Sequence, residues 1–273
     1  MRPALSTLGG VLTLLGAASC SEESNAQGVA VLQTPIIAND FVCEHPPYKI
    51  QLVSSSPLVI YIKNFLTEKE RAHLRTISND KFRHSIVADG TRSSQRTSQS
   101  TYVPRDPVVH CIESRSLAFQ GHDVPRSHLE PLQLVKYAPG EHYHFHTDWF
   151  KDPVYNFAVN GGNRASSFFA YVYVRNDTTG GGTNFPLIAP PKDERWCDVI
   201  DCDEPYDRGL TFRPIEGNAI YWENLNPEDS TGNQKTLHAG LPVTTGEKIG
   251  MNIWTRQAPL SDEARGPDEY PDI

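Results

Sequence analysis

The chain has 273 residues and a formal net charge of −8, with 38% hydrophobic and 21% charged residues. This length suffices for one large domain or two small ones with a real core, and the composition is typical of a soluble protein. No basic stripe runs along the sequence, so nucleic acid is not an expected partner.

The N-terminal stretch differs in composition from everything that follows. Arg2 precedes an uncharged run from Pro3 to Ser21 that has an apolar centre and small residues at positions 17 to 19. This pattern predicts a cleaved signal peptide over residues 1–20, and the alternatives are a non-cleaved signal anchor and a lipoprotein acylated at Cys20. The sequence offers no other transmembrane candidate, so we expect a membrane as a partner only if an anchor stays uncleaved.

The cysteine content agrees with a secretory protein, located in the endoplasmic reticulum lumen or secreted. Besides Cys20, the chain has Cys43, Cys111, Cys197 and Cys202, which can form two disulfides in such a compartment. We predict that Cys197 and Cys202 bond to each other because they are close in sequence. A zinc site is the alternative, but this C-x4-C pair has no second ligand pair nearby.

Weak periodicity over residues 21–56 predicts a linker that ends in an extended segment packed on the folded domain. The domain itself is expected to occupy residues 57–273 and to open with a β-branched strand, Pro57–Phe65. An acidic segment at 192–210 interrupts it as an inserted loop, which is either a lid or a solvated surface loop.

Two helices are expected before the main run of strands. Thr67 and Glu70 form a capping box that opens a helix reaching about Ser78. Asp106 precedes a proline and caps a second helix that runs to about Gln120, where Gly121 ends it. The polar stretch between these helices, 82–98, is expected to be a loop.

Short strands bounded by glycine and proline replace helices from Leu132 onward. They are expected at Leu132–Ala138, Tyr143–Trp149, Ser167–Arg175, Ala219–Trp222 and Ile249–Trp254. Helices that lead into many short strands predict an α+β, mainly β, fold, in which N-terminal helices support a jelly-roll core, or double-stranded β-helix, over about residues 129–257.

One of these strands carries half of a metal site. His146 and Asp148 are two residues apart, so on a strand both side chains point to the same face. His142 and His144 share that face and compete as ligands. An imidazole and a carboxylate need one more histidine to form the facial triad of non-haem iron oxygenases, and His238 is the only histidine downstream.

A lysine follows His238 at a sequence spacing that indicates a second binding residue. Lys248 comes ten residues after His238 and begins the strand-like stretch that ends at Trp254. A lysine that projects from the next strand of a barrel can bind an acidic co-substrate beside the metal. The alternative for Lys248 is an exposed lysine in a turn.

The sequence resembles the prolyl 4-hydroxylase alpha-subunit-like 2-oxoglutarate/Fe(II) dioxygenases over about residues 57 to 257. Four motifs in the same order carry the resemblance: Y-x-x-G-x-x-Y-x-x-H-x-D from Tyr137 to Asp148, the hairpin GGGTNFP from Gly180 to Pro186, P-x-x-G-x-A from Pro214 to Ala219, and H-x-G-x-P-V-x-x-G-x-K from His238 to Lys248. Arg164 and Trp254 match as well.

The resemblance implies an enzyme that uses Fe(II), 2-oxoglutarate and ascorbate to hydroxylate proline in a protein or peptide. His146, Asp148 and His238 would be the catalytic metal ligands. Lys248 would bind the distal carboxylate of 2-oxoglutarate, with hydroxyl groups from Tyr137 and Thr183 on the same co-substrate.

The resemblance also assigns four residues to the peptide substrate: Arg164, Tyr143, Arg96 and Ser98. The alternative for Arg164 is a structural ion pair, and for Arg96 a solvated loop charge. Tyr143 precedes His146 by three residues, so a regular strand would turn it away from the metal pair, and a bulge is needed to bring it back.

Two other functions remain open at the level of sequence. An enzyme with the same cofactors can hydroxylate a small molecule or a free amino acid. An inactive binding module on a jelly-roll scaffold is the alternative outside catalysis, although it has no need of an intact triad and lysine. The oligomeric state cannot be derived from the residues.

Overall fold

The computed structural model describes residues 41–86, 93–121, 123–155, 157–205 and 208–266. The predicted signal peptide or anchor and the first part of the predicted linker lie outside these residues. Within them the strands form an eight-stranded sheet in the order β1-β2-β11-β7-β14-β5-β4-β3, a four-stranded sheet in the order β10-β9-β12-β6, and the pair β13-β8.

The strands of the larger sheet are β1 (Lys49–Ser55), β2 (Leu58–Lys63), β3 (Arg83–His84), β4 (Gln99–Tyr102), β5 (Gln133–Tyr137), β7 (Arg164–Val174), β11 (Ala219–Glu223) and β14 (Lys248–Arg256). Those of the smaller sheet are β6 (Tyr143–His146), β9 (Thr183–Phe185), β10 (Leu210–Phe212) and β12 (His238–Gly240), and the pair consists of β8 (Thr179–Gly180) and β13 (Val243–Thr245). The helices are α1 (Glu68–Ser78), α2 (Pro107–Gln120) and α3 (Asp262–Arg265).

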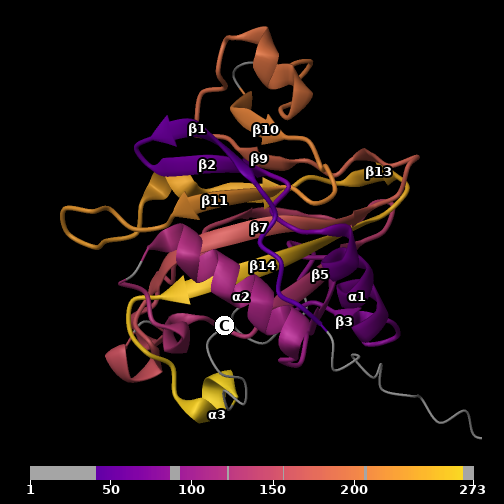
Figure 1. Ribbon diagram of the computed structural model, residues 1–273. Helices are drawn as coiled ribbons and strands as arrows, with labels where there is room; N and C mark the ends of the chain where they lie inside the picture. Colours follow the sequence, from indigo (N-terminus) through magenta and orange to yellow (C-terminus); the bar gives the residue numbers. More distant parts are fainter. Residues whose placement is uncertain (1–40, 87–92, 122, 156, 206–207, 267–273) are drawn as a thin grey trace, which may run out of the picture. The chain divides into compact units, whose positions relative to one another are not determined.

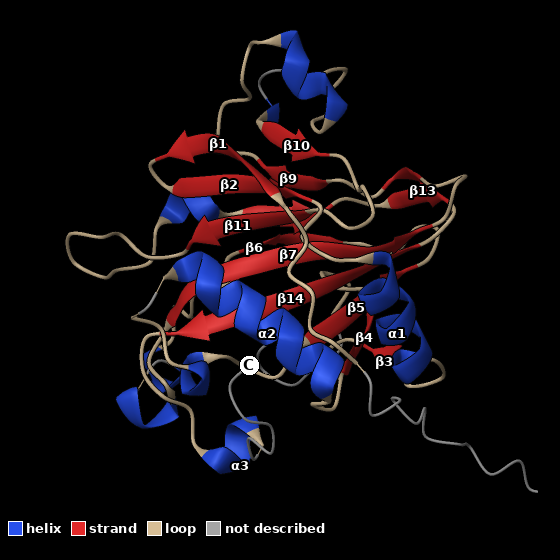
Figure 2. Cartoon of the chain, viewed as in Figure 1, coloured by secondary structure: helices blue, strands red, loops and turns tan. Residues whose placement is uncertain are grey.

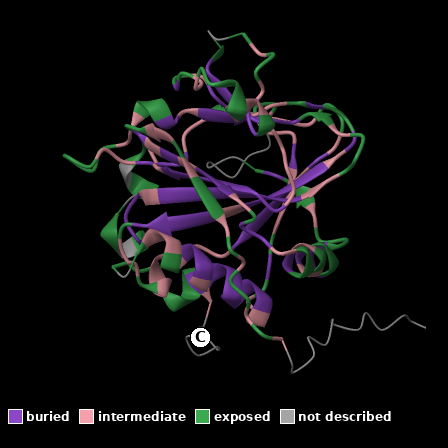
Figure 3. Ribbon diagram, turned by 45° about the horizontal axis from the view of Figure 1, so that its top comes forward, coloured by how far each residue is buried: buried purple, intermediate pink, exposed green. Residues whose placement is uncertain are grey.

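The larger sheet buries both of its faces, and β7 shows how. Phe168 and Ala170 face the helices, in the same apolar cluster as residues of α1 and α2. Phe169 and Tyr171 alternate with them and face inward, where Tyr171 clusters with Phe185 of the smaller sheet. Burial on both sides explains why β7 and β14 are buried over most of their length (Figure 3). These layers are those of the expected jelly-roll fold, with helices on one outer face.

The helices lie where the capping signals placed them. Thr67 and Glu70 form both hydrogen bonds of the capping box at the start of α1, and Asp106 accepts from two backbone amides at the start of α2. Figures 1 and 2 show both helices on the same side of the larger sheet, with α2 running across it. The two helices therefore cover the outer face of the sheet that carries Lys248 on β14.

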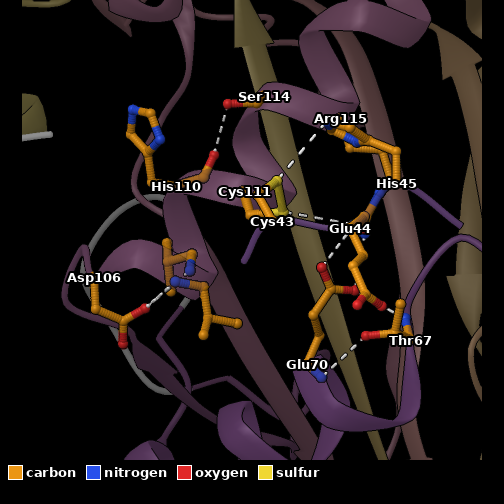
Figure 4. Close-up of a disulfide and its surroundings, with 12 residues drawn as sticks. Cys43, Glu44, His45, Thr67, Glu70, Asp106, His110, Cys111, Ser114 and Arg115 are labelled. Atoms are coloured by element: carbon orange, nitrogen blue, oxygen red, sulfur yellow. Dashed lines mark hydrogen bonds and ion pairs between the residues drawn. A yellow bond between two sulfur atoms is a disulfide. The ribbon is translucent and has the colours of Figure 1, made fainter. Parts of the chain in front are cut away.

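The segment that was expected to pack on the domain becomes its edge strand. β1 pairs antiparallel with β2, and a disulfide between Cys43 and Cys111 attaches the preceding residues to α2 (Figure 4). Beside it, the Arg115 guanidinium donates to both carboxylate oxygens of Glu70, at 2.7 and 2.9 Å. A bidentate pair that is almost fully buried needs this geometry, because either charge alone would be costly inside the protein.

The described residues hold a second disulfide, the predicted one between Cys197 and Cys202, which is confirmed. The two disulfides close loops of very different length, with sequence separations of 68 for Cys43–Cys111 and 5 for Cys197–Cys202. By the loop-entropy estimate, replacing both cysteines by serine should lower the free energy of unfolding by about 4 kcal/mol for the first pair and about 2 kcal/mol for the second. Urea denaturation of the two double variants measures this difference, and equal losses would contradict it.

Several expected boundaries are corrected by the structure. The polar stretch expected as a loop includes β3, which pairs with β4, and the strand expected to reach Trp149 ends at His146. Seven strands were not foreseen as separate elements: β3, β4, β8, β9, β10, β12 and β13. Each of these has two to four residues, too few for an alternating pattern to be visible in sequence.

The acidic insert connects β9 to β10. A short 3-10 helix, Glu194–Asp198, leads into the loop that Cys197 and Cys202 close, and Val199 and Ile200 anchor it in the core between the sheets. None of the residues that line the cavity described below comes from the described part of this insert. Among the described residues, no helix combines the length and apolar character that crossing a membrane requires.

Candidate active site

Two paired strands of the smaller sheet bring three metal-binding side chains together. His146 ends β6, Asp148 follows two residues later, and His238 opens β12 directly opposite His146. Nε2 of His146 lies 3.9 Å from Oδ1 of Asp148, and Nε2 of His238 lies 3.9 Å from Oδ2 of Asp148. One ligand atom of each residue lies within 4.8 Å of the others. His146 and His238 are 92 positions apart in sequence (238 − 146) and lie in one cluster because their strands are neighbours.

Hydrogen bonds to backbone carbonyls fix which nitrogen each histidine offers. Nδ1 of His146 lies 2.8 Å from the carbonyl of His144, and Nδ1 of His238 lies 2.8 Å from the carbonyl of Thr236. A carbonyl only accepts, so both Nδ1 atoms donate and both Nε2 atoms carry a lone pair. Burial lowers the pKa of His146 well below its ordinary value, and His238 adds to this effect. A neutral imidazole is the form that binds a metal.

The carboxylate of Asp148 is held in its charged form. Burial alone would raise its pKa, but the neighbouring His238, His146 and Arg164 lower it, and the hydroxyl of Ser167 does so too, bringing the pKa to about 2. Two imidazole nitrogens and one carboxylate oxygen, converging from one side, are the donor set that suits iron(II) with open positions for other ligands.

Tyr143 is turned toward this cluster, against the expectation for a regular strand. Between the partners His238–His146 and Gly240–Tyr143, β12 advances by two residues while β6 advances by three. The extra residue is a β-bulge, which reverses the facing of the side chains beyond it. The Tyr143 ring stacks on the His146 ring, with centroids 3.5 Å apart and planes at 13°. The competing ligand His144 is exposed and packs edge-on against Phe145.

The residues expected to bind the co-substrate lie around a buried lysine. The side chain of Lys248 is 0% exposed, its Nζ donates to the carbonyl of Gly181, and this nitrogen lies 4.5 Å from the centre of the Tyr137 ring. Thr183 Oγ1 lies 2.8 Å from the hydroxyl of Tyr171. Burial lowers the pKa of Lys248 to about 7. Tyr171 was not expected at this position, although its inward facing follows from the alternation along β7.

A single cavity joins the metal donors to the residues around the lysine. Twelve residues line it: Arg96, Tyr137, Tyr143, His146, Asp148, Phe169, Thr183, Trp222, His238, Gly240, Asn252 and Trp254. Gly240 has a steric reason to be glycine, because an added Cβ would lie 3.1 Å from the Tyr137 hydroxyl. The cavity therefore has a metal-binding side and a side lined by hydroxyl groups.

Arg164 lies at the edge of this site and is fixed by an ion pair. Its Nε and Nη2 donate to the two carboxylate oxygens of Glu130 at 2.7 and 2.8 Å, and its guanidinium lies 3.6 Å from the centre of the Trp254 ring. The structural ion pair considered from sequence is thus present, although its acidic partner, Glu130, was not foreseen. A charge fixed in this way can still present its remaining Nη1 nitrogen to a substrate.

The other two residues assigned to the substrate differ in their accessibility. The Arg96 guanidinium stacks over the Tyr143 ring at 4.6 Å from its centre, on the wall of the cavity. Ser98 is 0% exposed, and its hydroxyl contacts that of Ser85 at 3.2 Å and hydrogen-bonds with Tyr137. The structure therefore places Arg96 beside Tyr143, and Ser98 behind Tyr137.

Comparison with known proteins gives a consistent family assignment. The family model described as the 2OG-Fe(II) oxygenase superfamily matches residues 132–256. A protein named probable prolyl 4-hydroxylase 4 from Arabidopsis thaliana is 32% identical, with 81% of this chain and 74% of the plant protein covered. Prolyl 4-hydroxylase 2 from the same plant is 33% identical, with coverages of 76% and 70%.

A solved structure supports the fold. The viral collagen prolyl hydroxylase of Paramecium Bursaria Chlorella virus-1 superposes with a TM-score of 0.51 at 23% identity, covering 79% of this chain and 99% of that one. The resemblance and the jelly-roll fold expected from sequence are confirmed. The chain is an enzyme of the prolyl 4-hydroxylase family, within the 2OG-Fe(II) oxygenase superfamily.

Proposed function

We propose that this enzyme hydroxylates proline residues within peptides, with Fe(II) held by His146, Asp148 and His238. The observation that carries the proposal is the cavity that joins this donor set to the surroundings of Lys248. Within the described part of the chain, no carboxylate pairs with this fully buried lysine, and burial is what lowers its pKa. A lysine is almost never buried without a partner, and the distal carboxylate of 2-oxoglutarate would be that partner.

Iron and 2-oxoglutarate, when bound, would supply the oxidation that converts C–H to C–OH, with O₂ consumed and succinate and carbon dioxide released. The side chains of this enzyme would bind the co-substrate and hold it in position. Lys248 offers a charge-assisted hydrogen bond, and the hydroxyls of Tyr137 and Thr183 face the same cavity. The rings of Phe169 and Trp222 line it and limit the access of water.

The peptide would lie against the wall formed by Tyr143, Arg96 and Arg164. Two of these are cationic and held by aromatic stacking, Arg96 on Tyr143 and Arg164 on Trp254. Fixed guanidinium groups donate well to peptide carbonyls, because little side-chain freedom is lost on binding. Ser98 is fully buried and hydrogen-bonds with Tyr137, so it would support this co-substrate residue from behind and would not touch the peptide.

Arg164→Ala should raise the KM for a proline-rich peptide about tenfold or more, since one charged hydrogen bond contributes about 1.5–3 kcal/mol. The KM for 2-oxoglutarate should stay nearly unchanged, because Arg164 begins β7 whereas Lys248 pairs with Val174 at the other end of that strand. Steady-state kinetics with each substrate varied in turn measures both values. Arg175→Ala is the matched control, because Arg175 is exposed and pairs with Asp177 outside the cavity.

The choice between peptide and small-molecule substrates is tested with the wild-type enzyme. Free proline and a short proline-rich peptide are compared for a gain of one oxygen by mass spectrometry. A preference for free proline would overturn the peptidyl assignment and favour the small-molecule alternative. If neither free proline nor the peptide raises the rate of succinate formation above the rate without substrate, the result would instead favour a binding module.

We further propose that the enzyme works in the secretory pathway, in the endoplasmic reticulum lumen or outside the cell, and that ascorbate keeps its iron reduced. Two disulfides among the described residues support the first part, because such bonds persist in oxidising compartments. Labelling of free thiols in protein isolated from the source cells tests it. Loss of activity during turnover that ascorbate prevents would support the second part.

A further inference from the structure

Three buried polar side chains connect Asp148 to the core behind it. Ser167 Oγ donates to Asp148 Oδ2 at 2.7 Å, and Asn224 Nδ2 donates to the same Oγ at 2.9 Å. Trp222 Nε1 donates to Asn224 Oδ1 at 2.9 Å. Ser167 and Asn224 are 0% exposed and Trp222 is 1% exposed, so water does not compete for these bonds.

The indole of Trp222 sets the direction of every bond in this chain of side chains. An indole nitrogen can only donate, so the amide oxygen of Asn224 must face it and the amide nitrogen must face Ser167. Ser167 Oγ therefore accepts from Asn224, and its single proton goes to Asp148. This direction follows from donor chemistry and does not depend on an assigned orientation of the amide.

The backbone holds the same three residues in place. Trp222 on β11 is the direct cross-strand partner of Ser167 on β7. The backbone N–H of Asn224 donates to the backbone carbonyl of Ala165 at 2.8 Å. The Trp222 ring also meets the His238 ring edge to face, with centroids 4.8 Å apart. One indole thus both starts the donor chain to the carboxylate and packs against a second metal-binding side chain.

We propose that Ser167, Asn224 and Trp222 are positioning residues that make Asp148 a single-oxygen metal ligand. Each carboxylate oxygen lies 3.9 Å from one histidine Nε2, Oδ1 from His146 and Oδ2 from His238. Ser167 donates its proton to Oδ2, which favours Oδ1 as the oxygen that binds the metal. Outer partners of this kind orient a ligand before the metal arrives and so increase affinity. The inference rests on the proposed metal site, and the experiment below separates the two.

The test measures metal binding to the purified, metal-free protein by titration with Co(II) as a spectroscopic stand-in for Fe(II). Ser167→Ala removes the donor to Asp148, and Trp222→Phe keeps an aromatic ring but removes the N–H. Each variant should bind Co(II) about 10- to 100-fold more weakly than the wild type, with an altered visible absorption spectrum. Because the residues act in series, the double variant should lose little more than Ser167→Ala alone.

Tyr61→Phe is the matched control, because it removes a buried hydrogen bond between Tyr61 and Asn218 near the same sheet. It leaves the hydrogen bonds from Trp222 through Asn224 and Ser167 to Asp148 unchanged. It should bind Co(II) as the wild type does, and the melting temperatures of the metal-free proteins should show that all variants fold. Wild-type affinity in Ser167→Ala, an equal loss in Tyr61→Phe, or additive losses in the double variant would each overturn the donor chain. A wild-type protein that binds no metal would instead overturn the proposed metal site.

Discussion

His238→Ala should abolish turnover of 2-oxoglutarate and weaken metal binding by more than about 100-fold, beyond what the loss of an outer hydrogen-bond partner costs. His238 supplies one of three donor atoms, and its Nε2 is oriented for this by the bond from Nδ1 to Thr236. The variant keeps only the nitrogen of His146 and the carboxylate oxygen of Asp148, so the protein would supply two metal ligands in place of three.

The control for this variant stands on the neighbouring strand. His144→Ala removes a histidine that competes with His146 in the sequence pattern but that the structure leaves exposed. Metal titration and succinate formation in both variants give the comparison. Full activity in His238→Ala, or loss of metal binding in His144→Ala, would show that a different histidine completes the site.

The helices and long strands of this protein could be predicted because their signals are local. The capping box at Thr67 and the aspartate-proline pair at Asp106 each specify a helix start within a few residues, and the structure has both. β14 was expected from its strand-like central stretch, Ile249–Trp254, and the structure adds one residue before it and two after it. The start of β7 at Arg164 was missed by three residues, because its first residues are polar and small.

The features that could not be predicted depend on contacts between distant segments. The bulge that turns Tyr143 toward His146 exists only in the pairing of β6 with β12. The bond from Cys43 to Cys111 closes a long separation that no spacing rule specifies. Glu130 and Arg164 form a pair only because the fold brings their segments together.

The candidate site was predictable to a similar degree and for a similar reason. Spacing predicted His146 and Asp148 on one side of a strand, although Asp148 lies two residues beyond the end of β6. His238 was the only histidine downstream and Lys248 follows it by ten residues, and the order of motifs supported both. Ser98 shows where the order of motifs was insufficient, because it gives no information about burial, and the side chain lies behind Tyr137. Ser167 carried no signal in the sequence, since a single serine in an apolar strand has many possible roles.

Lys248→Ala should raise the concentration of 2-oxoglutarate needed for half-maximal rate more than Lys248→Arg, which keeps the charge but changes its reach and geometry. Removal of a buried charge partner of a carboxylate costs several kcal/mol, so the alanine variant should need about 100-fold more co-substrate or greater. Lys136→Ala is the control, because Lys136 on β5 is only half-buried and pairs with Glu247. An unchanged requirement in Lys248→Ala would assign the co-substrate to another basic residue.

The pH dependence of co-substrate binding should carry the signature of the same lysine. Burial lowers the pKa of Lys248 from 10.5 to about 7, so above that pH the free enzyme holds this amine mostly neutral. The distal carboxylate favours the charged amine, so binding should take up a proton, and the Kd for 2-oxoglutarate should rise about tenfold per pH unit above pH 7. Between about pH 7 and 10.5 the unfolded chain holds the extra proton, so this lysine makes the stability of the free enzyme rise with pH. Calorimetry in buffers of different ionisation enthalpy measures the proton uptake, which should vanish in Lys248→Ala. A Kd that does not change from pH 7 to 9 in the wild type would exclude a titrating lysine at the carboxylate.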